Sequence, residues 1–413
     1  MIVFIGFLLL LLYRVSKDKK RTIIYTLIFS FIINCIFLIF FTINSKAGNV
    51  YGVLGSDDLF YFENAIDLVK NPQDFFHQLN SFAGGYIVFC FLILYTSFIK
   101  IPLIISIVNI SIYLNILYII YWLLKEFKFK NSRINLIMFM LSINGFLIYT
   151  NIRILKDVLL FYLVLEIYYQ FLNKKRGNFL VIFLLLIFMN YIRPYSTYLM
   201  FFLLLLQNQI KKIDPNKIIK KEKYFIILGI IFIGVFYFIF KEQVDTTIRV
   251  ANLTALNDAE KFGSTIVLQY INAPLYKKII VGIIRFILLP IPIGILFSKD
   301  AIVYKILAIS GSCIWWLIMY NIFYNIVMSF NRKRYQEIYL LILFSFSFVL
   351  VYVIIYLGNA EPRLRYPMYI TGTIIALGRK IEEKKIRRIN VLFLIMINLS
   401  MFLVVNYLQF KRG

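Results

Sequence analysis

The chain has 413 residues, of which 61% are hydrophobic and only 16% charged, and its formal net charge is +25. Soluble globular domains have roughly 45–50% apolar and about 25% charged residues, so this composition excludes an ordinary soluble protein. The sequence predicts an all-α, polytopic integral membrane protein with a single membrane-embedded domain over residues 1–413.

Apolar segments of membrane-spanning length recur along the chain. A helix needs about 20 apolar residues to cross a 30 Å hydrocarbon layer. Residues 1–13 are apolar and precede a group of positive charges without a small-residue cleavage site, so we expect a first span there and no removed signal. The clearest later blocks are 22–43, 102–124, 224–240, 301–328, 338–357 and 391–405.

Six short segments between the apolar blocks are strongly basic. Lys and Arg are enriched in cytosolic loops of membrane proteins and meet anionic lipid there, which explains the net charge without a nucleic-acid partner. We therefore predict that all six face the cytosol, and that the protein resides in the bacterial cytoplasmic membrane. The segments are 14–21, 125–133, 174–176, 211–223, 332–337 and 379–388.

The chain must cross the membrane an even number of times between consecutive cytosolic segments. This condition leaves 85–99 and 279–297 as apolar segments that do not span, and we expect them to lie on the outer face or to re-enter from it. The count comes to about twelve transmembrane helices with both termini outside. The segments 44–84, which is acidic, and 241–278 become external loops, next to a cavity that is open to the outer face.

Cysteine and histidine usage argues against several chemistries. The three cysteines lie in apolar segments, and His77 is the only histidine. No disulfide framework, histidine-rich metal site or Ser-His-Asp triad is therefore expected. The sequence indicates no cofactor; a divalent metal is an alternative that no ligand pattern supports.

The external acidic loop contains adjacent carboxylates in the sequence Gly55-Ser-Asp57-Asp58-Leu-Phe-Tyr61-Phe-Glu63. Neighbouring residues cannot share one helix face, so one carboxylate can point into a cavity while the other binds a backbone N–H or a metal. A carboxylate near a dry boundary can act as a general base, which makes Asp57 and Asp58 catalytic candidates, with Glu63 in support. The alternative is a solvated loop in which these residues only cap the next helix.

A second polar group opens a middle span. On a helix, Arg153, Lys156 and Asp157 would share one face, where two cations and a counter-ion suit a phosphate. Arg193, which follows the end of a span and precedes a proline, is a further candidate for binding the phosphate. The alternative for these side chains is interfacial anchoring with extended, snorkelling cations.

Further cations fall on the predicted outer face near the end of the chain and in 279–297. Arg285 lies in the segment that does not span and needs an anionic partner there. Arg363 and Arg365 could clamp a phosphate, with Glu361 orienting one of them.

Three short motifs resemble those of the GT-C superfamily of membrane glycosyltransferases and of O-antigen and capsule repeat-unit polymerases. The motifs are Asp57-Asp58 with Tyr61 and Ala65, the Arg153/Lys156/Asp157 group, and Arg363-Leu-Arg365-Tyr366-Pro367. The resemblance implies a polyprenyl-phosphate- or pyrophosphate-linked sugar donor, Asp57 or Asp58 as the base, and phosphate contacts from Arg153, Lys156, Arg285, Arg363 and Arg365.

We therefore expect a transferase of lipid-linked sugars at the outer face, which adds one sugar or polymerises repeat units. Its partners would be the lipid-linked sugar or oligosaccharide, the bilayer and other polysaccharide-assembly proteins. A flippase or transporter of lipid-linked oligosaccharide is the main alternative, and it would need polar residues through the whole thickness of the bundle. An acyltransferase, which would rely on His77, is a third.

Overall fold

The structure is a computed structural model that describes residues 1–18, 21–47, 50–53, 55–81, 83–173, 177–212, 302–332 and 365–378, with Lys277, Gly282 and Leu392. The described residues up to Phe201, together with 302–331 and 365–378, belong to one compact unit. The fold and the site below are those of this unit.

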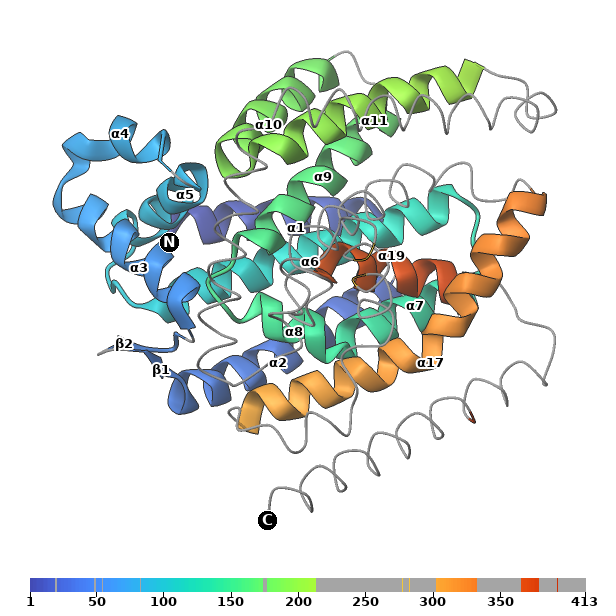
Figure 1. The fold of residues 1–413 in the computed structure, drawn as a ribbon, viewed down its shortest axis with the longest axis horizontal. Coiled ribbons are helices and arrows are strands. Elements are labelled where there is room, and N and C mark those ends of the chain that lie inside the picture. Colours follow the sequence, from blue (N-terminus) through green and yellow to red (C-terminus); the bar gives the residue numbers. More distant parts are fainter. Residues whose placement is uncertain are drawn as a thin grey trace. The chain divides into compact units, whose positions relative to one another are not determined.

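The described part of the chain is almost entirely helical, as predicted (Figure 1). A two-stranded antiparallel hairpin, β1 (Lys46–Ala47) with β2 (Val50–Tyr51), follows the second helix and pairs Lys46 with Tyr51. The helices are α1 (Ile2–Asp18), α2 (Arg21–Asn44), α3 (Gly55–Lys70), the 3₁₀ turn η1 (Pro72–Asp74), α4 (Phe75–Leu79), α5 (Gly84–Tyr95), α6 (Pro102–Glu126), α7 (Asn131–Ile143), α8 (Gly145–Asn151), α9 (Lys156–Asn173), α10 (Asn178–Ile192), α11 (Pro194–Lys212), α17 (Ile302–Arg332) and α19 (Tyr366–Leu377).

Several of these helices are long and apolar enough to cross a membrane. They are α2, α6 and the Ile302–Met319 part of α17; α7 and α8, which meet at a 56° bend, form a fourth candidate if they are one broken span. The described residues thus contain far fewer than the twelve predicted spans. The predicted spans 224–240, 338–357 and 391–405 lie outside the described residues, apart from Leu392.

Helix α5 agrees with the prediction that 85–99 does not span. It has 12 residues, which gives a length of about 18 Å, well short of the hydrocarbon layer. It packs against α3, α10 and α6. The other segment excluded by the crossing count, 279–297, lies outside the described residues apart from Gly282, as does the loop 241–278 apart from Lys277.

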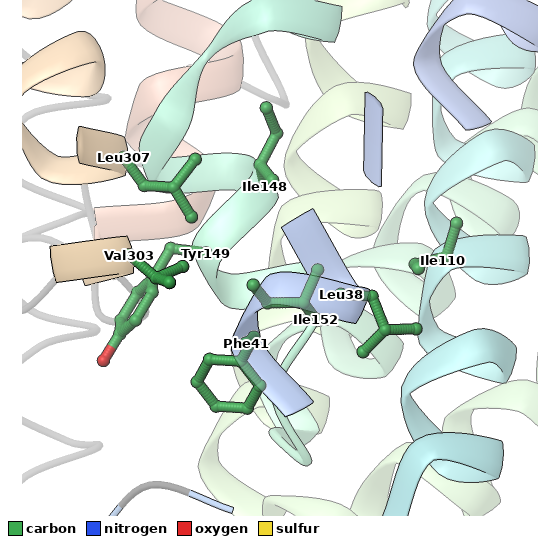
Figure 2. Close-up of a cluster of buried hydrophobic side chains, with 8 residues drawn as sticks. All are labelled: Leu38, Phe41, Ile110, Ile148, Tyr149, Ile152, Val303 and Leu307. Atoms are coloured by element: carbon green, nitrogen blue, oxygen red, sulfur yellow. The ribbon is translucent and has the colours of Figure 1, made fainter. Parts of the chain in front are cut away.

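Helix α6 is the central packing element of the unit. It contacts α1, α2, α7 and α9, and 83% of its most apolar stretch is buried. An apolar cluster on one of its sides brings α2, α6, α8 and the start of α17 together (Figure 2). Its members are Leu38, Phe41, Ile110, Ile148, Tyr149, Ile152, Val303 and Leu307.

The bend between α7 and α8 has a local cause in the sequence. The side chain of Asn144 caps α8 by accepting hydrogen bonds from the backbone N–H groups of Phe146 and Leu147. Gly145 then lies directly against the backbone of α17, because a Cβ atom there would overlap the carbonyl oxygen of Leu307. The chain therefore turns at Asn144 and packs closely at Gly145.

Candidate functional site

The first feature of the site is a buried ion pair between the acidic segment and the connection that precedes α9. The Nε and Nη2 atoms of Arg153 donate to the two carboxylate oxygens of Asp58 at 2.8 and 3.0 Å. The Asp58 side chain is fully buried and that of Arg153 is 7% exposed. Such a bidentate pair is specific in geometry as well as strong.

The position of Arg153 corrects one expectation from the sequence. Residues 152–155 are not helical: α8 ends at Asn151 and α9 begins at Lys156. Arg153 therefore does not share a helix face with Lys156 and Asp157, and its counter-ion is Asp58 rather than Asp157. Pairing across 95 residues of sequence has replaced the local pairing that a continuous helix would have allowed.

Two neighbours hold the Arg153 connection in place. Its backbone carbonyl accepts a hydrogen bond from the Asn109 side chain of α6 at 2.8 Å. Its guanidinium lies 5.2 Å from the centre of the Tyr149 ring, and its Nη1 donates to the Tyr149 hydroxyl at 3.2 Å. Figure 2 shows that hydroxyl directed away from the apolar cluster, in which the ring takes part. Tyr149 thus joins the apolar core to the ion pair.

A second ion pair lies at the start of α9. Arg193 Nη1 is 3.2 Å from Asp157 Oδ1, with the two side chains 12% and 6% exposed. Arg193 stands between α10 and α11 in extended backbone, as expected for a residue before a proline. Lys156 is buried beside this pair and interacts electrostatically with both members.

Tyr61 of α3 interacts with charged members of both ion pairs. Its ring faces the Lys156 ammonium at 5.8 Å and meets the ring of Tyr86 edge-to-face at 4.9 Å. Burial, and then the negative charge of Asp157, raise the pKa of Tyr61 well above its usual value. We call Asp58, Tyr61, Arg153, Lys156, Asp157 and Arg193 the polar cluster.

The start of α19 reaches the same region. The Tyr366 hydroxyl donates to Asn151 Oδ1 at 2.9 Å, and the Asn151 amide donates to Asn34 of α2 at 3.2 Å. Arg365, one residue earlier, is 1% exposed and lies beside the hydroxyl of Tyr369. Tyr366 of the late motif thus contacts Asn151, which lies two residues before Arg153 in the sequence.

Of the remaining predicted site residues, the structure describes Asp57 and Glu63. Asp57 is partly exposed in the first turn of α3, where negative charge is favoured, and Glu63 is exposed further along that helix. The two adjacent carboxylates therefore do point in different directions, as predicted. Arg285, Glu361 and Arg363 lie outside the described residues.

The polar cluster combines three basic side chains with two carboxylates, contributed by the start of α3, by residues 153–157 and by the connection between α10 and α11. Burying charges is costly, and several together mark a functional site by default. Its two guanidinium groups and the Lys156 amine are hydrogen-bond donors of the kind that bind an anionic ligand such as a phosphate group. Within the described residues, no group of three or more His, Cys, Asp or Glu side chains could hold a metal ion.

No protein-family model, curated protein or solved structure matches this chain.

Sequence reasoning assigned no separate role to several residues that the structure places around the cluster. Tyr61 appeared only as part of a motif, while Asn109 and Tyr149 were not singled out. The one signal available for Asn109 was a polar side chain inside an otherwise apolar helix, which tends to have a buried hydrogen-bond partner. For Tyr149, one aromatic residue among many, the sequence carried no signal.

Proposed function

We propose that this chain is a membrane glycosyltransferase of about twelve spans that uses polyprenyl-phosphate- or pyrophosphate-linked sugars at the outer face of the bacterial cytoplasmic membrane, in cell-surface polysaccharide assembly. Polymerisation of repeat units is the narrower form that we favour. The observation that carries the proposal is the polar cluster, a buried group of three cations and two carboxylates beside helices of membrane-spanning length.

The two adjacent carboxylates receive different roles. Asp58 is fully buried and bound through both oxygens by Arg153, so it positions the arginine and the start of α3. Asp57, next to Asp58 in the first turn of α3, is partly exposed and is the better candidate for the general base. Sequence alone left the choice between the two open.

The proposed reaction moves a sugar from a lipid phosphate to a hydroxyl group. The Asp57 carboxylate takes the proton of the acceptor hydroxyl, and the oxygen of that hydroxyl forms a bond to the anomeric carbon of the sugar. The bond from that carbon to the phosphate oxygen breaks, and the phosphate leaves with the electron pair. Fixed cations in a water-poor site stabilise such developing negative charge well, and Lys156 and Arg193 are the described residues to which we give this role.

Transport of a lipid-linked oligosaccharide remains the alternative from a different class. A third buried charge pair, Arg14 with Glu166, lies about ten residues further along α9 than Lys156, which is about 15 Å. The buried α9 residues between Val158 and Leu165 are apolar apart from the Tyr162 hydroxyl. Along α9 itself, few polar side chains therefore lie between the two charge groups.

The experiment compares cells that lack the gene and are complemented with wild type, Asp57→Asn or Asp67→Asn. Asp67 lies on the same helix in an exposed pair with Lys70 and serves as the matched control. We expect surface polysaccharide to be restored by wild type and Asp67→Asn, and lipid-linked intermediates to accumulate with Asp57→Asn at normal protein levels. Full restoration by Asp57→Asn would refute the assignment, and intermediates trapped on the cytosolic side would favour transport.

A further inference from the structure

A third buried charge pair lies outside the polar cluster and joins the first helix to α9. Arg14 Nη2 donates to both oxygens of Glu166 at 2.7 and 2.6 Å, and the two side chains are only 6% and 7% exposed. Arg14 was predicted to be part of a cytosolic basic segment. The structure instead continues α1 to Asp18 and turns the Arg14 side chain into the protein.

Several neighbouring side chains add to this contact. Gln170 donates to Glu166 Oε1 at 2.7 Å, which occupies that carboxylate further. The Arg14 guanidinium lies 5.3 Å from the centre of the Tyr169 ring, and its backbone carbonyl accepts from the Tyr118 hydroxyl at 2.8 Å. A charge pair with this many hydrogen bonds offsets much of the cost of its burial.

Asn115 of α6 hydrogen-bonds to α1 at two positions that are two helical turns apart. It accepts from Arg14 Nη1 at 3.3 Å and donates to the carbonyl of Phe7, two turns earlier, at 3.1 Å. The Phe7 ring also meets Tyr162 of α9 edge-to-face, with 5.5 Å between ring centres. Between these contacts α1 cannot slide or rotate without breaking several of them.

The apolar surface of α1 does not specify its position by itself. Ile2, Ile5, Leu9, Leu12 and Tyr13 are exposed, and lipid solvates such side chains as well as another helix does. A buried charge pair differs, because moving α1 away would leave Glu166 without its cation inside the unit.

We infer that Arg14 and Glu166 form an interhelical lock that fixes the depth and rotation of α1 against α6 and α9. Arg14 is then a core residue of the folded protein and contributes nothing to the cytosolic surface charge. The lock does not depend on what reaction the protein carries out.

The test measures the proximity of α1 and α5, which packs against α6, in the full-length protein. Cysteines replace Phe7 and Phe89, whose ring centres are 6.5 Å apart, in a background without the three native cysteines, and a short bifunctional maleimide joins them when α1 is docked. The variants are Arg14→Met, Glu166→Leu, the double variant of both, and Lys17→Met, whose parent residue is exposed on the same helix. Thermal unfolding in detergent is recorded in parallel, without the introduced cysteines.

Each single variant is expected to lose most of the cross-linking and to unfold several degrees lower, because one charge stays buried alone. The double variant should recover towards wild type, since neither charge remains. Lys17→Met should behave as wild type. The lock is refuted if Arg14→Met and Glu166→Leu behave as Lys17→Met does, or if the double variant is no better than the worse single one. If the single variants do not accumulate in cells, the readout is the protein level of the double variant. A level near that of wild type supports the lock, and a level as low as that of the single variants refutes it.

Discussion

Replacing Asp58 by Asn tests the ion pair at the centre of the polar cluster. The substitution keeps the shape of the side chain and removes its charge, so that Arg153 stays 7% exposed beside a neutral amide. In wild type, Arg153 donates hydrogen bonds at 2.8 and 3.0 Å to the two oxygens of Asp58. In the variant, the amide oxygen still accepts one weaker hydrogen bond, whereas the amide NH₂ group faces an N–H of the arginine and can accept none. The Arg153 contacts to Tyr149 remain.

The magnitude follows from the burial of the pair. Removing one partner of a buried pair costs about 3–5 kcal/mol because the other charge is left uncompensated. The stability of a typical domain is about 5–15 kcal/mol, so this loss is a large fraction of the total. Asp67→Asn is the matched control, because Asp67 and Lys70 are 69% and 67% exposed and such pairs contribute about 0–1 kcal/mol.

The assay is thermal unfolding of both variants, purified in the same detergent and followed by tryptophan fluorescence or by loss of the monodisperse fraction. Asp58→Asn should unfold at a markedly lower temperature than wild type, and Asp67→Asn at nearly the same temperature. Equal midpoints for the two variants would show that Asp58 is not paired inside the folded protein, and would remove the basis for separating its role from that of Asp57.

Two further substitutions test the packing that positions the site. Gly145→Ala should destabilise the protein strongly, because the added Cβ atom meets the carbonyl of Leu307. Gly177→Ala is the control and should have little effect, because no atom lies within 4 Å of a Cβ atom there. The unfolding midpoints of the two variants check this. Tyr366→Phe removes the 2.9 Å hydrogen bond to Asn151 and should cost about 1–3 kcal/mol, because a buried acceptor loses its donor. An unfolding midpoint like that of wild type would contradict the second expectation.

The sequence was sufficient for those features that depend on local pattern. Apolar length predicted α2 and α6 almost to the residue, and the 12-residue length of α5 agrees with the crossing count that left it out of the spans. The separation of Asp57 from Asp58 also follows from local geometry, because adjacent residues on a helix face different directions.

Contacts between distant segments could not be predicted in the same way. Nothing local distinguishes Asp58 from Asp157 as the partner of Arg153, and the helical spacing favoured the wrong one. Likewise, nothing in the local sequence distinguishes Arg14 from the basic residues that follow it, and only its contact with Glu166 does so. In both cases the choice is made by burial in the assembled unit, which favours whichever carboxylate can be enclosed together with the cation.

The most direct test of the proposed function uses the purified protein in lipid nanodiscs with a polyprenyl-phosphate- or pyrophosphate-linked, radiolabelled sugar or repeat unit as donor, and an acceptor with a free hydroxyl. We expect wild type to form a new glycosidic bond, and Asp57→Asn to bind the donor lipid while transferring at least about 10²-fold more slowly, as for loss of a general base. Transfer at the wild-type rate by Asp57→Asn, or donor movement across the bilayer without any new bond, would contradict the account.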